Sequence, residues 1–331
     1  MSVSALGIPD VDPTLEAQVV AGLQSVEARL QASVEFDDDM LSQASGHLIS
    51  AGGKRFRPMM VLVAGHVGDP TAAELVSAAT VVELTHVATL YHDDVMDDAA
   101  IRRGASSVNA RWGNSVAILV GDLLFAQASD LCSELGAASV RLQARTFSRL
   151  VRGQYRETIG PAAGVEPVEH YLTVLADKTA SLIATSARFG GVHAGAESSV
   201  VEALGAYGEH VGMAFQLADD LLDIEGDPTE SGKMPGTDLR EGVPTLPALY
   251  VQQSSDPADA RLRQLLSGPI ADDSEHAEAL AALRVHPAMG RARAELRRWV
   301  DGARAALDGV PAGTARNALD ALCGTVVDRT G

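Results

Sequence analysis

Two stretches of the sequence share one design, an apolar run with helical spacing that ends in aspartates. The first run covers residues 72–90 without glycine or proline, so we expect a long helix with Asp93 and Asp97 near its C-terminal end. At 3.6 residues per turn these two carboxylates lie on one helix face. The second stretch repeats the spacing at Asp219 and Asp223. This repeated pattern constrains the fold most, because it predicts two long helices with acidic ends.

Each acidic helix end is electrostatically unfavourable without a cation. The C-terminus is the negative end of the helix dipole, and two carboxylates about 5 Å apart repel by roughly 3 kcal/mol at an effective dielectric of about 20. Hard carboxylate oxygens in this arrangement suit Mg²⁺. For one cluster alone a solvated acidic helix end is the alternative, but the repetition favours metal binding. The candidate metal ligands are Asp93, Asp94, Asp97, Asp219, Asp220 and Asp223.

Composition supports a helical core and limits the partners. Apolar residues make up 46% of the 331 residues, but aromatic residues only 4%. A core of mostly Ala, Leu and Val suits closely packed helices better than a sheet sandwich. The net charge of −18 argues against a nucleic-acid partner, because phosphate backbones need Lys and Arg surfaces.

Other sequence features concern the compartment. Cys132 and Cys323 are far apart without metal-type spacing, so we expect buried thiols in a reducing compartment. No basic residue precedes Arg29, which argues against a signal or transit peptide. No uncharged apolar run reaches about 18 residues, which argues against a transmembrane segment. The sequence therefore predicts a cytoplasmic protein.

Helical patterns follow one another along the chain, without βαβ alternation or a series of hairpins. We expect a flexible N-terminal arm over residues 1–12 and a single domain over residues 13–331. Thr71 is a candidate N-cap for the first aspartate helix, and a polar loop is expected after Gly104. The predicted fold is all-α, one helical bundle of about a dozen helices around a central cavity. Expected helices cover residues 15–34, 40–49, 59–67, 114–135, 140–158, 168–189 and 198–225.

The few cations of this acidic chain gather near the motifs. Lys54, Arg55 and Arg57 stand at a predicted helix start, where backbone N–H groups also favour anions. Arg102 and Arg103 follow the first aspartates, where they either bind an anion or balance charge in a salt bridge. Two carboxylate clusters that face each other across a bundle can chelate several divalent cations and bridge them to a diphosphate, which supports departure of a phosphate leaving group. A di-iron carboxylate bundle is the alternative, but only one Glu-x-x-His pair, at residues 83–86, is evident.

The motifs, in their order from Gly52 to Pro247, resemble those of trans-isoprenyl diphosphate synthases, the polyprenyl synthetase family. The resemblance covers about 60% of the chain. The matching stretches are Gly53-Lys54-Arg55-Phe56-Arg57-Pro58, His86, Asp93-Asp94-Val95-Met96-Asp97 with Arg102-Arg103, Gly153-Gln154, Lys178-Thr179, Phe215-Gln216 with Asp219-Asp220 and Asp223, and Lys233 with Gly236 and Asp238.

The resemblance implies the isoprenoid synthase fold and a Mg²⁺-dependent prenyltransferase with three Mg²⁺ ions per active site. It implies a homodimer that condenses isopentenyl diphosphate head to tail with an allylic diphosphate. Substrate-binding roles fall on Lys54, Arg57, His86, Arg102, Arg103 and Lys233. Catalytic roles fall on Asp93, Asp97, Lys178, Thr179, Gln216 and Asp219.

One departure from the family pattern concerns the allylic substrate, and two small residues concern the product length. The family often has Lys after the glycine of its Gly-Lys-x-Thr-Leu-Pro stretch, but this chain has Val243 there. Short-chain members often have aromatic residues four or five positions before the first aspartate motif, whereas this chain has Ala88 and Thr89. By resemblance, these small residues imply an open tunnel and a trans-polyprenyl product longer than farnesyl diphosphate.

Other functions stay open for this sequence. A geranylgeranyl diphosphate synthase is the second candidate, and a subunit of a heteromeric synthase, catalytic or non-catalytic, is another. A terpene cyclase shares the helical fold and the aspartate chemistry. A cyclase should lack the isopentenyl diphosphate set of Lys54, Arg57 and Arg103, which this chain has.

Overall fold

The computed structural model describes residues 4–226 and 235–328, and these residues are predominantly helical, which confirms the all-α prediction. The described residues divide into two compact units. The first comprises residues 4–148, 182–208 and 307–321, and the second comprises residues 149–181, 209–226, 235–306 and 322–328. The predicted organisation as an arm followed by one domain stays a prediction.

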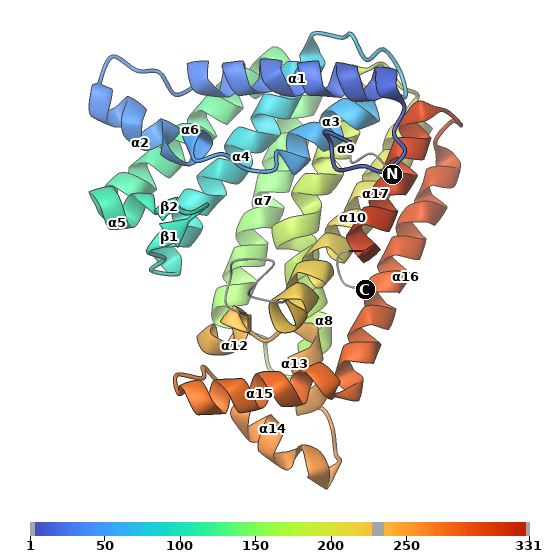
Figure 1. The fold of residues 1–331 in the computed structure, drawn as a ribbon. Helices are drawn as coiled ribbons and strands as arrows, with labels where there is room; N and C mark the ends of the chain where they lie inside the picture. Colours follow the sequence, from blue (N-terminus) through green and yellow to red (C-terminus); the bar gives the residue numbers. More distant parts are fainter. Residues whose placement is uncertain (1–3, 227–234, 329–331) are drawn as a thin grey trace. The chain divides into compact units, whose positions relative to one another are not determined.

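Helix α4 (Glu74–Met96) is the central helix of the first unit. It packs against α1 (Pro13–Ala32), α3 (Phe56–Gly65) and α6 (Asn114–Glu134) (Figure 1). Most of its side chains are buried, as expected for a helix with neighbours on several sides. This helix contains residues 74–90 of the predicted apolar run, and its packing fixes the end that carries the first aspartates.

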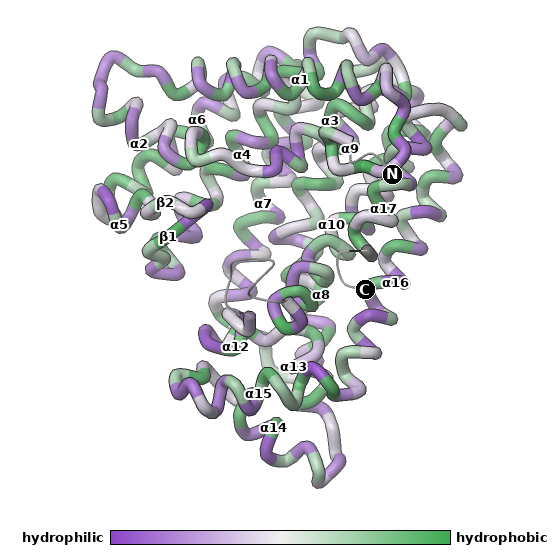
Figure 2. Tube along the Cα trace, in the orientation of Figure 1, coloured by the Kyte–Doolittle hydropathy of each residue, from purple (hydrophilic) through white to green (hydrophobic). Residues whose placement is uncertain are grey.

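Helix α1 shows how the sequence sets a helix boundary. Its buried residues Leu15, Val19, Val26 and Leu30 recur between hydrophilic ones (Figure 2). The Asp12 side chain accepts hydrogen bonds from the first turn, and Pro13 occupies the first helical position. The helix therefore begins two residues before the predicted start.

The segment around the first aspartate helix differs from the prediction at two points. Thr71 is not the N-cap of α4, because its N–H and hydroxyl both donate to the Asp69 carboxylate in the preceding turn. After α4 the chain forms a small hairpin, β1 (Ile101–Arg102) and β2 (Ala105–Ser106). Arg103 and Gly104 have φ of 53° and 76°. Two positive φ angles are typical of the tight two-residue turn that suits a hairpin.

The first unit contains two more helices, and a third begins in it. The chain in this region forms α2 (Asp39–Ser50), α5 (Val108–Trp112) and α7 (Ala137–Ile159), which contributes residues to both units. Helix α6 has a mean hydropathy of 1.5 over 18 residues and is the one helix of the described chain that is long and apolar enough to cross a membrane. Buried core helices pass the same test, and 39% of that window is buried. Helices α4, α5 and α2 pack against it.

The second aspartate helix and an interrupted helix each contribute residues to both units. The sequence predicts one helix over residues 168–189. The structure instead divides it into α8 (Pro167–Leu175), a π-helical turn η1 (Ala176–Ala180) and α9 (Ser181–His193). Helix α10 (Ser198–Glu225) has the predicted boundaries.

The remaining elements follow the second aspartate helix. The chain continues through α12 (Thr237–Glu241), α13 (Leu246–Gln252), the 3₁₀ turn η2 (Pro257–Asp259) and α14 (Ala260–Leu265). Helix α15 (Asp273–Val285) packs between α14 and α16 (Pro287–Ala306), and α16 also contacts α13. The 3₁₀ turn η3 (Leu307–Gly309) and α17 (Thr314–Asp328) end the described chain.

Candidate active site

The first aspartate motif lies at the C-terminal end of α4, as predicted. Asp93 is half-buried and Asp97 is exposed, whereas Asp94 is fully buried. Arg102 donates from Nε to Asp94 Oδ1 over 2.6 Å. Burial raises the pKa of Asp94, although Arg102 acts in the opposite direction. The three aspartates of this motif therefore have different environments, and the buried one pairs with a cation of the protein.

Asn109 joins the end of α4 to the segment that leads into the hairpin. Its buried side-chain amide donates to the backbone oxygens of Asp94 and Ala99, over 3.1 and 3.2 Å. The Ala99 N–H also donates to the Asp94 oxygen over 2.9 Å. These bonds satisfy carbonyl groups that a helix end leaves without an intrahelical partner. They also fix the hairpin of Arg102 and Arg103 beside the aspartates.

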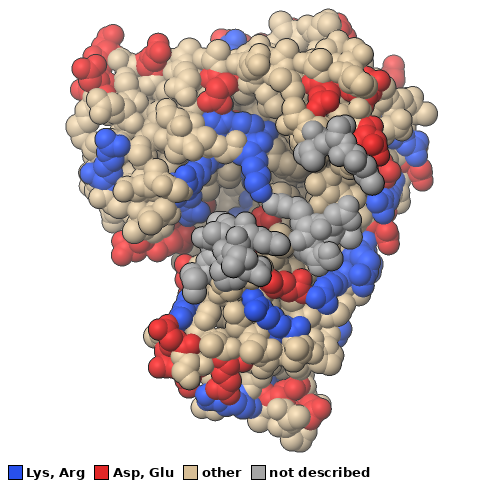
Figure 3. All heavy atoms as spheres, viewed as in Figure 1, with Lys and Arg blue, Asp and Glu red and all other residues tan. Residues whose placement is uncertain are grey.

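An arginine cluster surrounds one buried carboxylate in the first unit. Glu83 of α4 is 2% exposed and lies 3.0 Å from Arg55 and 3.5 Å from Arg103. Arg103 also donates to the Leu48 carbonyl over 2.7 Å. In Figure 3, Lys and Arg side chains gather on this face near the connection between α2 and α3. Since the arginines outnumber the buried carboxylate, the cluster is suited to bind an anion.

Arg57, in the first turn of α3, has a hydrogen-bond donor that is available to an anion. Its Nε is buried and has no hydrogen-bond partner within the described part of the chain. Burial, together with the nearby Arg103 charge, lowers the pKa of Arg57 to about 10, while Glu83 raises it. At neutral pH the guanidinium stays protonated. A buried donor without a partner is costly, so a bound anion would relieve an existing cost.

His86 lies within the field of the same arginines. Burial, followed by the charges of Arg57, Arg103, Arg102 and Arg55, holds the pKa of His86 well below its usual value. The imidazole is therefore neutral at pH 7 and can donate one hydrogen bond to an anion. The sequence predicted this residue as a substrate ligand. Lys54 is exposed on the loop before α3.

The second aspartate motif repeats the arrangement of the first. Asp219 and Asp223 are half-buried, and Asp220 is 7% exposed. Tyr171 donates to Asp220 Oδ2, and Gln216 donates to its Oδ1 over 2.9 Å. Burial raises the pKa of Asp220 to about 6 despite these two donors. As with Asp94, the second aspartate is held by donors of the protein.

Asp223 organises the start of α12. Its two carboxylate oxygens accept from the N–H groups of Thr237 and Asp238, each over 3.1 Å. Burial and the neighbouring Asp223 and Asp220 charges raise the pKa of Asp238 to about 8. A cation placed among these carboxylates would favour their charged forms. Sequence reasoning gave Asp238 no role beyond its place in the loop motif.

The π-helical turn carries Lys178 and Thr179. Thr179 donates to Gln216 Oε1 over 3.1 Å, and Lys178 pairs with Glu157. A Cβ at Gly153 of α7 would lie 2.5 Å from the Lys178 nitrogen, and one at Gly212 of α10 would lie 2.5 Å from the Ala180 Cα. Both helices therefore approach the turn closely because they have glycine there. Single π turns within helices are frequent at functional sites.

Arg149 secures the beginning of this turn. Its guanidinium donates to the Ala176 carbonyl and to Asp177, over 2.9 and 2.8 Å, and pairs with Glu209. Arg156 also pairs with Asp177. The carbonyl and carboxylate at the start of η1 thus have cationic partners. No sequence motif pointed to Arg149 or Glu209.

The donor set suits hard divalent cations. Within residues 4–226 and 235–328, no three His, Cys, Asp or Glu side chains stand close enough to hold a metal ion by themselves. Each motif offers less buried carboxylates, Asp93 and Asp97 in the first and Asp219 and Asp223 in the second. Oxygen ligands of this kind fit Mg²⁺, which keeps several waters and binds through one or two carboxylates together with substrate phosphates. The residues present therefore fit a metal that arrives with a phosphate ligand.

The structure brings the predicted site residues together in two separate sets. In the first unit Arg57, His86 and Arg103 share one electrostatic cluster around Glu83, and Asp94 pairs with Arg102. In the second unit Thr179, Gln216 and Asp220 form one hydrogen-bonded chain. Lys233 lies outside the described residues. Sequence reasoning missed Asn109 and Tyr171 as site-building residues, and it missed Glu27, which pairs with Arg55 over 2.9 Å, since none of them belongs to a recognisable motif.

These features define an all-α protein with two acidic helix ends and an arginine cluster that suits a phosphate ligand. The family model described as Polyprenyl synthetase matches residues 38–283. The chain belongs to the polyprenyl synthetase family, which confirms the resemblance found in the sequence.

Particular relatives extend over almost the whole chain. The chain is 48% identical over 326 residues to the nonaprenyl diphosphate synthase of Mycobacterium tuberculosis (strain ATCC 25618 / H37Rv), with 98% of this chain and 97% of that protein covered. It is 34% identical over 249 residues to the octaprenyl diphosphate synthase of Escherichia coli (strain K12), which covers 75% of this chain and 76% of the relative. The crystal structure of geranylgeranyl pyrophosphate synthase from Corynebacterium glutamicum, complexed with calcium and isoprenyl diphosphate, superimposes with a TM-score of 0.88. Its sequence identity is 45%, and the match covers 97% of this chain and 98% of that one.

Proposed function

We propose that this chain catalyses the Mg²⁺-dependent head-to-tail condensation of isopentenyl diphosphate with an allylic diphosphate. The product is a trans-polyprenyl diphosphate longer than farnesyl diphosphate. Membership of the family makes the chain a prenyltransferase. The long-chain synthases among its relatives, such as the nonaprenyl and octaprenyl enzymes, support the product length.

In this proposal the arginine cluster of the first unit binds isopentenyl diphosphate. Arg57 and Arg103 provide charge-assisted hydrogen bonds to the diphosphate, Lys54 adds a third cation, and neutral His86 donates one hydrogen bond. The buried, unpartnered Nε of Arg57 is the single observation that carries this assignment, since it marks a donor prepared for an anion. Binding holds the nucleophilic double bond in one orientation, which reduces the entropic part of the barrier.

The aspartate motifs and the π-helical turn act on the allylic substrate. Asp93 and Asp97 of the first motif and Asp219 of the second would hold Mg²⁺, three ions in this proposal, and the bound metal would supply positive charge that favours departure of the allylic diphosphate. Arg102, Lys178 and Lys233 provide further positive charge for the same diphosphate. Thr179 and Gln216 place oxygen dipoles beside the cationic carbon. Asp94, Asp220 and Asp223 complete the metal-binding motifs.

The reaction balances without another reactant. The bond between C1 and oxygen of the allylic diphosphate breaks, and the electron pair leaves with the diphosphate. The double bond of isopentenyl diphosphate then attacks C1, forming the new carbon–carbon bond. A proton is lost from the adjacent carbon to the departed diphosphate, which leaves a trans double bond.

Substitution of one aspartate in each motif tests this function. Asp93→Ala and Asp219→Ala should each lower turnover by about a thousandfold, the rate equivalent of several kcal/mol of lost metal stabilisation. Asp98→Asn is the matched control, because Asp98 is exposed with φ of 48° and Asn tolerates that conformation. Products from Mg²⁺, isopentenyl diphosphate and a series of allylic primers are measured by mass. Near-normal turnover in either alanine variant would contradict the assignment.

Geranylgeranyl diphosphate synthesis is the second candidate function. It is favoured by the 45% identity to the geranylgeranyl pyrophosphate synthase from Corynebacterium glutamicum. The same mass measurement distinguishes the two, because a geranylgeranyl synthase stops at four isoprene units under excess isopentenyl diphosphate. Activity of the purified chain alone also excludes a requirement for a second kind of subunit.

We also propose that the chain forms a homodimer in the cytoplasm. Ile118 and Leu119 of the apolar helix α6 are 43% and 67% exposed, and exposed apolar helix faces are typical of protein interfaces. Sedimentation equilibrium should give twice the chain mass, and Leu119→Glu should shift the equilibrium toward monomer. The two buried cysteines, Cys132 and Cys323, suit a reducing compartment.

A further inference from the structure

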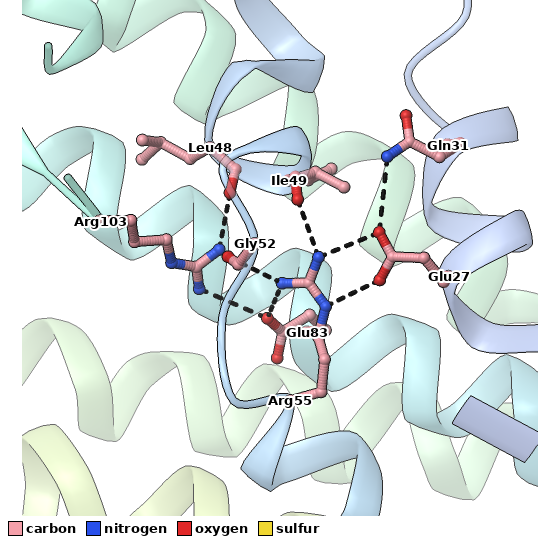
Figure 4. Close-up of polar contacts among 8 residues, drawn as sticks. All are labelled: Glu27, Gln31, Leu48, Ile49, Gly52, Arg55, Glu83 and Arg103. Atoms are coloured by element: carbon pink, nitrogen blue, oxygen red, sulfur yellow. Dashed lines mark hydrogen bonds and ion pairs between the residues drawn. The ribbon is translucent and has the colours of Figure 1, made fainter. Parts of the chain in front are cut away.

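In the sequence Arg55 lies between Lys54 and Arg57, two predicted substrate ligands. Every N–H donor of its own side chain already has a partner within the protein. Its Nε donates to Glu27 over 2.9 Å, and Nη2 donates to Glu27 and to the Ile49 carbonyl over 3.1 and 2.9 Å (Figure 4). Its Nη1 donates to Glu83 and to the Gly52 carbonyl over 3.0 and 3.3 Å. A guanidinium has five N–H donors, so none is left for a substrate.

These partners come from three elements. Glu27 lies on α1, Glu83 lies on α4, and the Ile49 and Gly52 carbonyls belong to the end of α2 and the connection that follows it. The Arg55 side chain is only 11% exposed. The geometry is that of a clamp in which one side chain binds a loop to the two helices beside it.

The loop between α2 and α3 needs such a clamp because its backbone is unusual. Gly52, Gly53 and Arg55 have φ of 91°, 149° and 48°. A left-handed conformation at a residue with a side chain costs free energy and persists only where the surroundings enforce it. Arg55 enforces it through its own bonds to the carbonyls that precede it. Lys54 lies within this strained segment, and Arg57 follows it in the first turn of α3.

The clamp also sets the charge balance of the arginine cluster. Gly53 passes between two guanidiniums, since a Cβ there would lie 3.0 Å from Arg103 Cζ and 3.1 Å from Arg55 Nη1. Arg55 neutralises the buried Glu83 at 3.0 Å, whereas Arg103 stands at 3.5 Å. If Arg55 withdrew, Glu83 would draw Arg103 or Arg57 toward itself. Those guanidiniums would then be less available to an anion.

We propose that Glu27 and Arg55 are a positioning pair for this reaction: they hold the loop of residues 52–54 and reserve Arg57 and Arg103 for the diphosphate of isopentenyl diphosphate. Arg55 itself does not touch the substrate. The naming of the substrate depends on the proposed function, whereas the role of the pair in anion binding does not. Glu27 thereby gives α1, which contains none of the family motifs, a part in the affinity of the site.

A direct substrate contact by Arg55 makes the opposite prediction. If Arg55 bound the diphosphate itself, Glu27 would compete for it, and Glu27→Gln would leave affinity unchanged or improve it. If Arg55 is a clamp, Glu27→Gln breaks the paired charge-assisted bonds and weakens binding. The sign of the effect therefore decides between the two.

The first measurement is calorimetric binding of inorganic diphosphate to the full, metal-free chain. Glu27→Gln should weaken binding by about three- to tenfold and Arg55→Lys by more than about tenfold, because charged hydrogen bonds are lost. Arg29→Gln is the matched control. Arg29 also lies on α1 and pairs with Glu134 over 2.8 Å, but the two side chains are 40% and 60% exposed and neither is bonded to the cluster. The Arg29→Gln variant should bind inorganic diphosphate as tightly as the wild-type chain does.

The second measurement separates the substrates in steady-state kinetics. Glu27→Gln should raise the Michaelis constant for isopentenyl diphosphate and leave that for the allylic primer and kcat near wild type. A melting curve checks that each variant is folded. If Arg55→Lys does not fold, Glu27→Gln, which preserves side-chain size, carries the test. Unchanged or tighter diphosphate binding by folded Glu27→Gln overturns the inference. Weakened binding in a chain that makes no prenyl product would overturn the proposed function and leave the positioning pair intact.

Discussion

Tyr171 on α8 donates a hydrogen bond to Asp220 on α10, the second aspartate of its motif. The first motif has the same arrangement, since Arg102 donates to Asp94, again the second aspartate. In both motifs the residue at this position is buried. The second aspartate of each motif is thus bonded to a donor of the protein, whereas the aspartates on either side of it are less buried.

Tyr171→Phe should destabilise the metal-free protein in a pH-dependent way. The change leaves one oxygen of a buried carboxylate without its donor, which costs about 1–3 kcal/mol. Burial raises the pKa of Asp220 in the folded chain to about 6, above its ordinary value of 3.8. The folded state thus binds a proton at Asp220 more tightly than the unfolded state does. The free-energy cost of burying the ionised carboxylate disappears as the pH falls below both pKa values, because the carboxyl group is then protonated.

Denaturant unfolding of the wild type and Tyr171→Phe, from pH 7.5 down to pH 4, measures this effect. The deficit of the variant should be largest above about pH 6 and should shrink toward about pH 4. A deficit that stays constant with pH would show that Tyr171 contributes packing alone.

Val243→Lys should tighten binding of the allylic diphosphate. Val243 is 39% exposed at the end of α12, and its N–H donates to the Asp238 carbonyl over 2.9 Å. The backbone bond does not depend on the side chain, so the fold should tolerate lysine. A new charge-assisted contact is worth about 1–2 kcal/mol, which lowers the Michaelis constant for the primer about five- to thirtyfold. Val243→Met is the uncharged control of similar length, and equal constants for the two variants would show that this position does not reach the substrate.

Gly153→Ala should disturb the π-helical turn. The added Cβ would lie 2.5 Å from the backbone nitrogen of Lys178, a distance that requires α7 and η1 to separate. We expect a loss of about 2–4 kcal/mol in unfolding free energy, as for other overpacked sites, together with lower turnover. Gly290→Ala is the control, because Gly290 lies within α16 and a Cβ there meets no atom within 4 Å. That change should stabilise the helix by up to about 1 kcal/mol. Equal melting temperatures for the two variants would contradict the close approach.

Thr89→Phe should shorten the product. Thr89 lies one helical turn before Asp93 and is half-buried, whereas Ala88 is fully buried. An aromatic ring at position 89 therefore has room to block a growing prenyl chain. At position 88 the ring would overpack the core and cost about 1–3 kcal/mol. Product mass distributions under excess isopentenyl diphosphate test this, with Thr89→Ser as control. A Thr89→Phe enzyme that makes wild-type lengths would place the growing chain elsewhere.

Local patterns in the sequence predicted much of the fold and the site. The spacing of apolar residues predicted the long helices that carry Asp93 and Asp219 near their C-terminal ends, and α10 has the predicted boundaries, residues 198–225. Positions of Gly and Pro gave the loop before α3 and the first turn at Pro58. These features depend on helical periodicity and on backbone preferences, which are properties of neighbouring residues. For the same reason the motif residues could be recognised without a structure.

Only the tertiary structure decided which of these residues face inward and what they contact. In the sequence, Asp93 and Asp94 are neighbouring carboxylates of one motif, and Arg55 and Arg57 are cations of another. Burial separates them, because Asp94 meets Arg102 and Arg55 meets Glu27, a partner 28 residues away on another helix. The π-helical turn likewise forms where α7 and α10 approach through Gly153 and Gly212, residues of two other helices. Periodicity places a side chain on a helix face, but only packing between distant segments determines which neighbour that face meets.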